Sequence, residues 1–335
     1  MNLVGRGKAV GTHALNRAVS PSIARIIGEP VFWFLRMRGG AVRKELAQAK
    51  RVVVVRLDEI GDVVLTTPFL RELRRNLSEA WITLVVKPQV YNLVQLCPYV
   101  NEVVTYDWSA AGHFSELRRH WRALRLARTC FWRRRFDVAI VPRWDVDWYH
   151  AAFVAYLSGA RDRVAYAADV LERKARVNSC YDRLYTKRLH ERTVKHEVER
   201  NLDVIRLLGG TVRSAGLEAW VGPEDRAFAA ARICDEHVKN TRLIALGPGG
   251  RDRKRRWPVE NFVELGAHLV RDCGARLVVL GAASEAALGS ALEQELGDAL
   301  VNLVGKTSLR QATAVLERCV MYVGNDYGVK HLAAA

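Results

Sequence analysis

The Gly324-Asn325-Asp326 turn near the end of the chain has the residue types of a phosphate-binding junction. It follows an apolar stretch, Cys319 to Val323, and precedes a helical stretch that carries Lys330 and His331. Glycine permits a tight turn, and a helix that begins there directs unpaired N–H groups and its positive dipole end toward an anion. The alternative is an ordinary turn in which Asp326 only caps the helix.

A second cationic segment follows the strand predicted at Leu243 to Leu246. Gly247-Pro248-Gly249-Gly250 leads into Arg251-Asp252-Arg253-Lys254-Arg255-Arg256, which has five cations in six residues. We predict a diphosphate site in this segment, which includes Gly249, Lys254 and Arg255, because arginine can bind phosphate oxygens bidentately. A solvated basic loop or a nucleic-acid patch is the alternative.

Asp62 is the candidate general base. It follows Gly61 after the strand predicted at Val52 to Val55, at the end of a parallel strand where ligands bind. A positioned base that takes the proton of a hydroxyl contributes roughly 10²- to 10⁴-fold in rate. Capping of the next helix is the alternative role for Asp62, and Asp58 and Glu59 in the same loop are rival carboxylates.

The elements that must position these residues alternate between strand and helix, which predicts an α/β fold with parallel sheets. The alternation of strands and helices is interrupted at Gly209-Gly210 and from Gly216 to Pro223, which indicates a domain boundary. We therefore predict an N-terminal basic and aromatic extension at 1–50, one Rossmann-like domain at 51–215 and a second at 216–335. The predicted strands are Val52–Val55, Ile82–Val86, Glu102–Thr105, Val138–Val141, Leu243–Leu246, Leu277–Leu280, Leu300–Leu303 and Val320–Val323.

Taken together, these motifs resemble glycosyltransferase family 9, the lipopolysaccharide heptosyltransferases. The resemblance covers roughly residues 51–335. Its two main motifs are Gly61-Asp62-Val63-Val64-Leu65-Thr66-Thr67-Pro68 and Gly324 to Ala335, and they occur in the family's order. Asp137 to Val141, Leu157 to Arg161 and Arg255 to Pro258 are similar to further family landmarks.

The resemblance implies a GT-B architecture, in which two Rossmann-like domains with parallel sheets face one another. It also implies an inverting transfer of a heptose from a nucleotide-sugar, with ADP-heptose as the expected donor, to a lipopolysaccharide core acceptor, with Asp62 as the base. No cofactor is expected. No metal is expected either, since the cationic loop can neutralise the diphosphate.

In the family, residues that match Asp326, Tyr327 and Gly328 contact the donor, and the residue that matches His331 approaches the diphosphate. Tyr327 replaces the family's usual Thr or Ser. Because the phenol is bulkier, the resemblance predicts the identity of the donor sugar less specifically than the fold. Glu285 stands near the family's acidic contact to the nucleotide ribose, and an exposed helix charge is its alternative role.

The acceptor is expected against the first domain. Residues Leu117 to Phe136 read as a basic amphipathic helix that includes Arg122, which suits the phosphates of a glycolipid. Arg143, Trp144 and Asp145 follow the strand Val138 to Val141, and an Arg-Trp-Asp cluster can stack on a sugar ring and bind its hydroxyls. A surface helix and a closing loop are the respective alternatives.

Composition supports an anionic partner. The 335 residues carry a formal net charge of +16, which favours nucleic acid, an anionic membrane or a phosphorylated glycolipid. The family resemblance favours the glycolipid, so we expect no nucleic acid but a cytoplasmic protein in peripheral contact with the inner membrane. The segment Val31 to Arg38 is either a membrane-interface foot or part of a helix packed on the domain.

Two further expectations concern the limits of the family resemblance. The chain ends within the helix that the Gly324 turn begins, so we expect the second domain to lack its last strand and helix relative to the family. The functional alternative is a non-catalytic basic module that binds nucleic acid or an anionic membrane. A nicotinamide dehydrogenase is disfavoured, because Arg56 to Asp62 offers one glycine instead of G-x-G-x-x-G.

Overall fold

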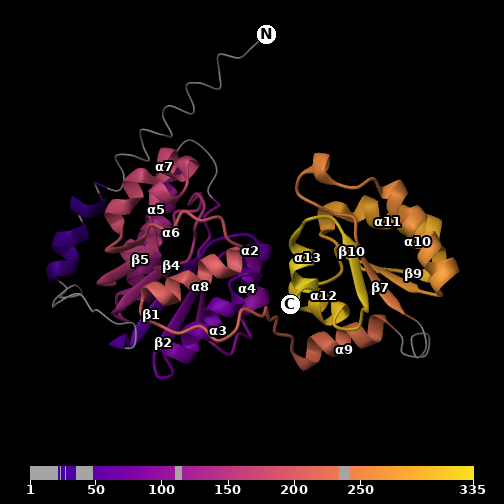
Figure 1. The fold of residues 1–335 in the computed structure, drawn as a ribbon, viewed down its shortest axis with the longest axis horizontal. Helices are drawn as coiled ribbons and strands as arrows, with labels where there is room; N and C mark the ends of the chain where they lie inside the picture. Colours follow the sequence, from indigo (N-terminus) through magenta and orange to yellow (C-terminus); the bar gives the residue numbers. More distant parts are fainter. Residues whose placement is uncertain (1–21, 23, 27, 35–47, 110–114, 234–241) are drawn as a thin grey trace, which may run out of the picture. The chain divides into compact units, whose positions relative to one another are not determined.

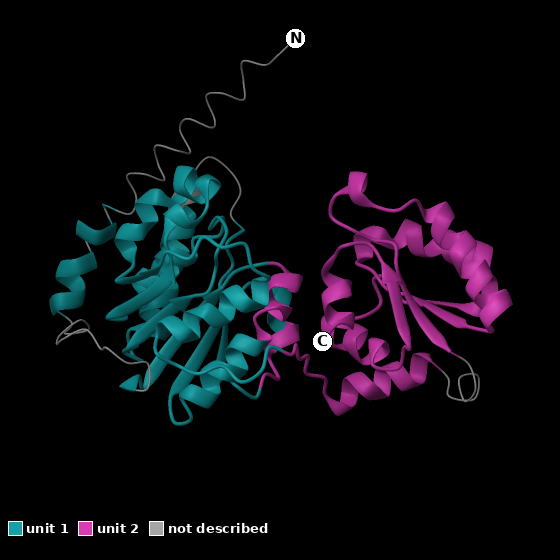
Figure 2. Cartoon of the chain, in the orientation of Figure 1, with its two compact units in different colours: residues 1–58, 68–91, 98–215 teal, residues 59–67, 92–97, 216–335 magenta. Residues whose placement is uncertain are grey.

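The computed structural model describes residues 22, 24–26, 28–34, 48–109, 115–233 and 242–335, in which parallel strands alternate with helices (Figure 1). The chain forms two compact units (Figure 2). Unit 1 consists of residues 1–58, 68–91 and 98–215, and unit 2 consists of residues 59–67, 92–97 and 216–335. The predicted α/β class with two parallel sheets is confirmed.

Unit 1 contains a six-stranded parallel sheet in the order β3-β2-β1-β4-β5-β6. On either side of the central strand β1, neighbouring strands are joined by crossover connections, because parallel neighbours cannot be joined by a tight turn. The strands are β1 (Arg51–Arg56), β2 (Trp81–Val86), β3 (Glu102–Thr105), β4 (Val138–Val141), β5 (Asp162–Tyr166) and β6 (Lys187–Leu189). Helices α3 (Thr67–Asn76) and α4 (Pro88–Val94) lie on one side of this sheet, and α5 (Ser115–Leu126) and α6 (Ala151–Leu157) lie on the other (Figure 1).

The helices that accompany this first sheet are α3 (Thr67–Asn76), α4 (Pro88–Val94), α5 (Ser115–Leu126), α6 (Ala151–Leu157), α7 (Glu172–Asn178) and α8 (Glu197–Leu207). A π-helical turn, η2 (Ala127–Phe131), continues α5. The core of the unit includes Val53, Val55 and Ala139 from the strands and Phe131 from the π-helix, all fully buried.

Unit 2 contains a four-stranded parallel sheet in the order β10-β7-β8-β9. Its strands are β7 (Leu243–Gly247), β8 (Arg276–Val279), β9 (Leu300–Asn302) and β10 (Met321–Gly324). Its helices are α2 (Ile60–Val64), α9 (Pro223–Arg232), α10 (Val259–Cys273), α11 (Ala286–Leu296), α12 (Leu309–Leu316) and α13 (Gly328–Ala333). The order reverses between β7 and β10, which makes their carboxyl ends the switch point of the sheet.

All eight predicted strands are present, with ends that differ by at most one residue. Two strands of unit 1, β5 and β6, were not predicted. The helix expected from Leu117 to Phe136 is also wrong in its extent, because α5 gives way to the π-helical turn and the chain leaves helical geometry after Phe131. No helix in the described ranges has both the length and the apolar character needed to cross a bilayer.

Candidate active site in unit 2

Unit 2 has a cavity of about 440 Å³ beside the turns that follow β7 and β10. The residues around it include carboxylates, cations, a phenol and two glycines. They are Glu59, Ile60, Gly61, Asp62, Arg251, Arg255, Asp326, Tyr327, Gly328 and His331. Six of the predicted site residues, namely Asp62, Arg255, Asp326, Tyr327, Gly328 and His331, therefore line one cavity.

Glu285 holds the glycine-rich loop from behind instead of lining the cavity. Its carboxylate accepts hydrogen bonds from the backbone N–H of Gly250 at 2.8 Å and of Ala282 at 2.9 Å. A Cβ atom at Gly249 would lie 2.3 Å from both carboxylate oxygens, closer than real contacts allow. Gly249 is thus required for the loop to pass over Glu285.

Asn325 ties the two turns together. Its backbone N–H donates to Gly247 O at 3.0 Å, and its side-chain amide donates to Pro248 O at 2.9 Å. The side-chain oxygen accepts from the backbone N–H of Trp257 at 2.9 Å. One side chain therefore fixes the loop after β7, the start of α10 and the turn after β10.

Gly247 and Gly324 serve a purpose other than the tight turn predicted from the sequence. Neither Gly247 nor Gly324 has a positive φ angle. A Cβ at Gly247 would lie 2.0 Å from the Tyr322 hydroxyl, and one at Gly324 would lie 2.2 Å from it. These glycines make room for the Tyr322 ring, and burial raises the pKa of its hydroxyl.

Asp326 is surrounded by cations. Its carboxylate accepts from Arg255 Nη2 at 2.9 Å and pairs with Lys330 one helical turn later. The hydrogen bond from Lys330, followed by the charges of Lys330 and Arg255, lowers the pKa of Asp326. Asp326 thus stays ionised and orients Arg255 at the rim of the cavity.

Tyr327, at the position where the resemblance implies Thr or Ser, points toward Glu285. Its hydroxyl donates to Glu285 Oε2 at 3.2 Å. Burial raises the pKa of Tyr327 to about 12, and the neighbouring Glu285 carboxylate adds to the effect. The phenol therefore remains protonated at neutral pH and acts only as a hydrogen-bond donor or acceptor.

Asp62 enters the cavity from the short helix α2, which is packed against α13. Gly61 lies against the ring of His331, because a Cβ at this position would come within 2.4 Å of the imidazole Cδ2. A Cβ at Gly328 would likewise contact the Ile60 side chain at 3.2 Å. The absence of side chains at Gly61 and Gly328 lets the carboxylate-bearing turn approach the histidine-bearing helix.

The two rival carboxylates have different surroundings. Asp58 is buried in unit 1, where it pairs with Arg56 at 2.9 Å and with Arg143. Glu59 lines the cavity with Asp62 and pairs with Arg251 at 3.3 Å. Glu59 thus remains a rival for Asp62, whereas Asp58 is neutralised within a buried network.

Three of the predicted donor-binding residues do not line the cavity. Lys254 is exposed on the short turn η6 (Arg253–Arg255), Gly249 belongs to the glycine-rich loop, and Glu285 lies behind that loop. Sequence reasoning did not single out Arg251 and Ile60, which line the cavity, or Asn325. Arg251 belongs to the cationic run and Asn325 to the Gly324-Asn325-Asp326 motif, but spacing alone could not show which residues of these segments face the cavity.

The predicted acceptor residues lie in unit 1. Arg122 pairs with Asp107 at 3.0 Å, and Asp145 pairs with Arg173. The Trp144 ring is only 7% exposed and is covered by the Arg200 guanidinium 3.7 Å from its centroid, so this ring is used in packing. A role for these residues in acceptor binding stays a prediction.

Asp145 and Asp147 have the Asp-x-Asp spacing found in metal-dependent sugar-nucleotide sites, a pair that sequence reasoning overlooked. Asp147 is buried and accepts from the backbone N–H groups of Ala151 at 3.1 Å and Ala152 at 2.9 Å. Its carboxylate therefore caps the start of α6, while that of Asp145 is held by Arg173.

Part of the N-terminal extension is helical and packed on unit 1. Phe32 is buried and contacts the rings of Trp132 and Tyr156 edge-on. The adjacent Trp33 and Phe34 are about 80% and 79% exposed. The rest of the predicted foot, Leu35 to Arg38, lies outside the described residues.

Known proteins share both the sequence pattern and this fold. A sequence profile described as glycosyltransferase family 9 (heptosyltransferase) matches residues 123–335. The chain is 24% identical over 288 residues to lipopolysaccharide heptosyltransferase 3 of Escherichia coli (strain K12), and the match covers 82% of this chain and 76% of that relative.

Solved structures show the same fold. The glycosyltransferase family 9 protein of Veillonella parvula DSM 2008 has a TM-score of 0.70 at 22% identity, covering 85% of this chain and 77% of that one. E. coli heptosyltransferase WaaC with ADP-2-deoxy-2-fluoro heptose has a TM-score of 0.64 at 20% identity, covering 85% of each chain. The fold is thus of the GT-B type. With the profile matching more than half of its length, this chain belongs to glycosyltransferase family 9 and is a glycosyltransferase.

Proposed function

We propose that this protein transfers a heptose from ADP-heptose to a lipopolysaccharide core acceptor, with inversion at the anomeric carbon. Family membership supports sugar transfer. The curated relative is named a lipopolysaccharide heptosyltransferase, and one solved relative was determined with a fluorinated ADP-heptose. The observation that carries the proposal is a cavity in which Asp62 shares the lining with Arg251, Arg255 and His331.

In the proposed mechanism, Asp62 removes the proton of the acceptor hydroxyl as the hydroxyl oxygen attacks the anomeric carbon. The bond from that carbon to the diphosphate breaks, and its electron pair leaves with ADP. Negative charge therefore grows on the diphosphate during the reaction, and cations fixed in advance stabilise it most effectively. Arg255, oriented by Asp326, and Arg251 are the residues proposed for this role.

The donor-binding set is Gly249, Lys254, Arg255, Glu285, Asp326, Tyr327, Gly328 and His331. Within it, Glu285 and Gly249 act by shaping the loop, and α13 has only six residues. We therefore assign most of the diphosphate binding to side-chain cations and less to the dipole of that helix than the sequence had suggested.

On the acceptor side, we retain Arg122, Arg143, Trp144 and Asp145 as proposed contacts of a phosphorylated glycolipid. Support comes from the exposed face of α5, where Trp121 and Leu124 stand among arginines. Such a surface also suits peripheral contact with an anionic membrane.

The decisive experiment measures heptose transfer by the full chain with ADP-heptose and a heptose-free lipopolysaccharide acceptor, followed by mass spectrometry of the product. Asp62→Asn keeps the size of the side chain but cannot accept the proton, so we expect a fall of roughly 10²- to 10⁴-fold in kcat. Glu59→Gln is the matched control and should retain activity within about tenfold of the parent.

Wild-type turnover by Asp62→Asn would contradict the assignment of the base. If Glu59→Gln alone abolished transfer, Glu59 would replace Asp62 in the mechanism. A non-catalytic binding module is not favoured, since the cavity and family membership both point to chemistry. It would be supported only by absent turnover together with salt-sensitive retention of DNA.

A further inference from the structure

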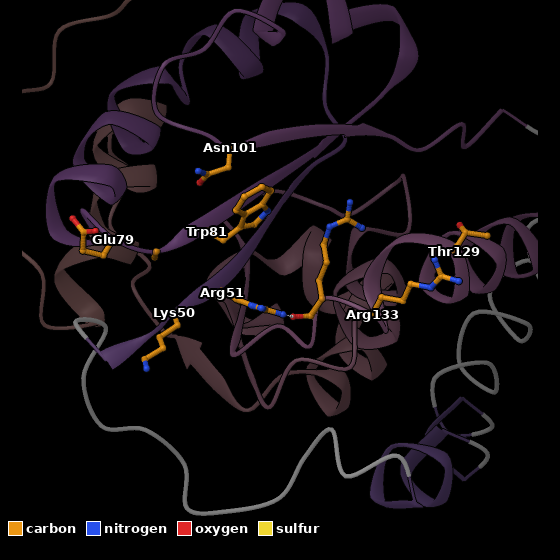
Figure 3. A pocket seen from close by; sticks show the side chains of 9 residues that line it. Lys50, Arg51, Glu79, Trp81, Asn101, Thr129 and Arg133 are labelled. Carbon is orange, nitrogen blue, oxygen red and sulfur yellow. Dashed lines mark hydrogen bonds between the residues drawn. The ribbon is translucent and has the colours of Figure 1, made fainter.

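Unit 1 contains a second cavity, of about 640 Å³, at the amino ends of β1 and β2. Its lining includes Lys50, Arg51, Glu79, Trp81, Arg133 and Arg134 (Figure 3). Ligands of parallel α/β sheets bind at the carboxyl ends of the strands. This cavity lies at the opposite end of the sheet, so neither the fold nor the proposed transfer reaction accounts for it.

The backbone around the cavity is held by two half-buried side chains, Asp137 and Arg74. Asp137 Oδ2 accepts from the backbone N–H of Lys50 at 2.8 Å and of Arg51 at 3.0 Å. On the other wall, the Arg74 guanidinium donates to the carbonyls of Ser78 at 2.9 Å and Ala80 at 2.8 Å. The two edges of the cavity are thus fixed in place before any ligand arrives, which lowers the entropic cost of binding.

The cations of the cavity fall into two groups. Arg134 pairs with Glu102 and donates to Cys130 O, and Arg51 donates to Arg134 O. These two arginines are therefore used within the protein. Lys50, Arg133 and Glu79 are exposed, and within the described part of the chain their side chains form no ion pair.

The π-helical turn η2 leads directly into the turn that carries Arg133. The backbone N–H of Trp132 donates to Ala127 O, five residues earlier, at 2.9 Å. One extra residue in this turn changes which side chains face the sheet edge, and such turns are frequent at functional sites. Ala127 and Phe131 are buried in the core, while Thr129 and Arg133 border the cavity (Figure 3).

Trp81 supplies an aromatic surface to the same cavity as the exposed cations Lys50 and Arg133. Its ring is 46% exposed, although its backbone N–H is fixed to Lys50 O at 2.8 Å. A half-exposed indole offers one face on which the apolar C–H face of a sugar ring can stack. Glu79 on the same cavity can accept hydrogen bonds from sugar hydroxyls, while it would repel a ligand that is negatively charged throughout.

We propose that this cavity binds a phosphorylated saccharide at a second site, separate from the transfer reaction. Lys50 and Arg133 supply the positive charge that attracts the phosphate, Trp81 stacks on the sugar ring and Glu79 accepts from a hydroxyl. A phosphate-bearing sugar satisfies all of these groups at once, whereas inorganic phosphate would leave Trp81 and Glu79 without partners.

Isothermal titration calorimetry of the full chain with glucose 6-phosphate tests this site. We expect Lys50→Ala combined with Arg133→Ala, and separately Trp81→Ala, to weaken binding at least tenfold. Arg128→Ala removes an exposed cation of the π-helical turn η2 that does not line the cavity, and this variant should bind as the parent does. Trp81→Phe retains an aromatic face and should lose less than Trp81→Ala, which separates loss of stacking from loss of folding.

Asp62→Asn, which alters only the proposed reaction centre, should leave this binding unchanged, so the two sites are judged independently. Equal affinity for inorganic phosphate and glucose 6-phosphate would overturn the proposal in favour of a simple anion patch. Tighter binding of AMP than of glucose 6-phosphate would overturn it in favour of a nucleotide site. Unchanged binding in the Lys50 and Arg133 double variant would also overturn it.

Vesicle co-sedimentation distinguishes the two sources of such a ligand. Retention on vesicles that carry a phosphorylated glycolipid, but not on phosphatidylglycerol vesicles, assigns a lipid-linked sugar phosphate. Calorimetric binding without that retention assigns a soluble one. The opposite result is retention of the parent protein on phosphatidylglycerol vesicles alone, and loss of this retention in the Trp81→Ala and Lys50/Arg133 variants. That result would identify the cavity as a membrane-binding patch and overturn the proposal.

Discussion

The buried carboxylate of Glu285 restricts which amino acids fit at the neighbouring positions. It accepts from two backbone N–H groups on different loops and from the Tyr327 hydroxyl. Satisfying these donors compensates for the cost of removing the carboxylate from water. The glycine-rich loop must therefore pass close over it, and Gly249 is the point of closest approach.

We predict that Gly249→Ala displaces this loop, because the added methyl would lie 2.3 Å from the Glu285 oxygens. The variant should lose about 1–3 kcal/mol of stability by overpacking and should show a raised KM for the donor. Thermal unfolding and transfer kinetics test both effects. Ser284→Ala, an exposed change on the neighbouring turn, is the control, and a Gly249→Ala protein equal to it would contradict this account.

Lys174 allows a second prediction at this scale. It is buried and donates to the carbonyls of Arg143 at 3.1 Å and Tyr166 at 3.0 Å. Burial lowers its pKa from 10.5 to about 8. Between these values the unfolded chain binds more protons than the folded chain, so this residue makes the free energy of unfolding increase as pH rises through that window.

Urea unfolding of Lys174→Met at several pH values from about 7.5 to about 10.5 tests this sign. Relative to the parent, the variant should lose the rise in stability with pH across this window, whatever its absolute stability. Lys50→Met, an exposed lysine, should keep the rise. A parent and a Lys174→Met protein with equal slopes would show that Lys174 does not titrate in this range.

At the scale of elements, the turns after β7 and β10 act as one unit because Asn325 joins them. We predict that Asn325→Ala, which removes the bonds to Pro248 O and Trp257 N, raises the donor KM by about tenfold, equivalent to ~1.4 kcal/mol of lost binding. Asn325→Asp keeps the acceptor for the Trp257 N–H and should have the smaller effect. Donor titrations of kcat and KM would contradict this if both variants matched the parent.

The elements that sequence patterns predicted well are those with continuous apolar runs. Strands such as Val52 to Val55 are buried on both faces and read clearly. Strand β5 escaped prediction because it contains Asp162 and Arg163, which are nevertheless buried. Arg163 is accommodated by donating to the carbonyls of Leu184 and Ala160, and the contact with Leu184 joins residues that no local pattern connects.

The same limit applies to the candidate site. The motifs predicted Asp62, Asp326 and His331 as site residues, because each lies in or near a turn between a strand and a helix. It could not show that Glu285 lies behind the glycine-rich loop or that Tyr322 fills the space left by Gly247 and Gly324. Those arrangements depend on packing between strands that are neighbours in the sheet but far apart in the sequence.

At the scale of the whole molecule, each unit has its own hydrophobic core. That of unit 2 includes Phe262, Leu277 and Leu292, all at most 1% exposed. We predict that Phe262→Ala destabilises unit 2 by about 3–5 kcal/mol through the cavity it leaves. Calorimetry should then resolve two transitions, of which only one moves, and a uniform shift of a single transition would contradict independent cores.

The segments 59–67 and 92–97 are encoded within the first half of the chain but are packed as parts of unit 2. Hence a chimera that joins two family members at residue 216 alone would pair the Gly61 of one parent with the His331 of the other. Since that approach leaves no space for a side chain at position 61, functional recombinants should inherit all three pieces from the same parent. Crossover points for shuffling relatives therefore belong on either side of each of these short insertions.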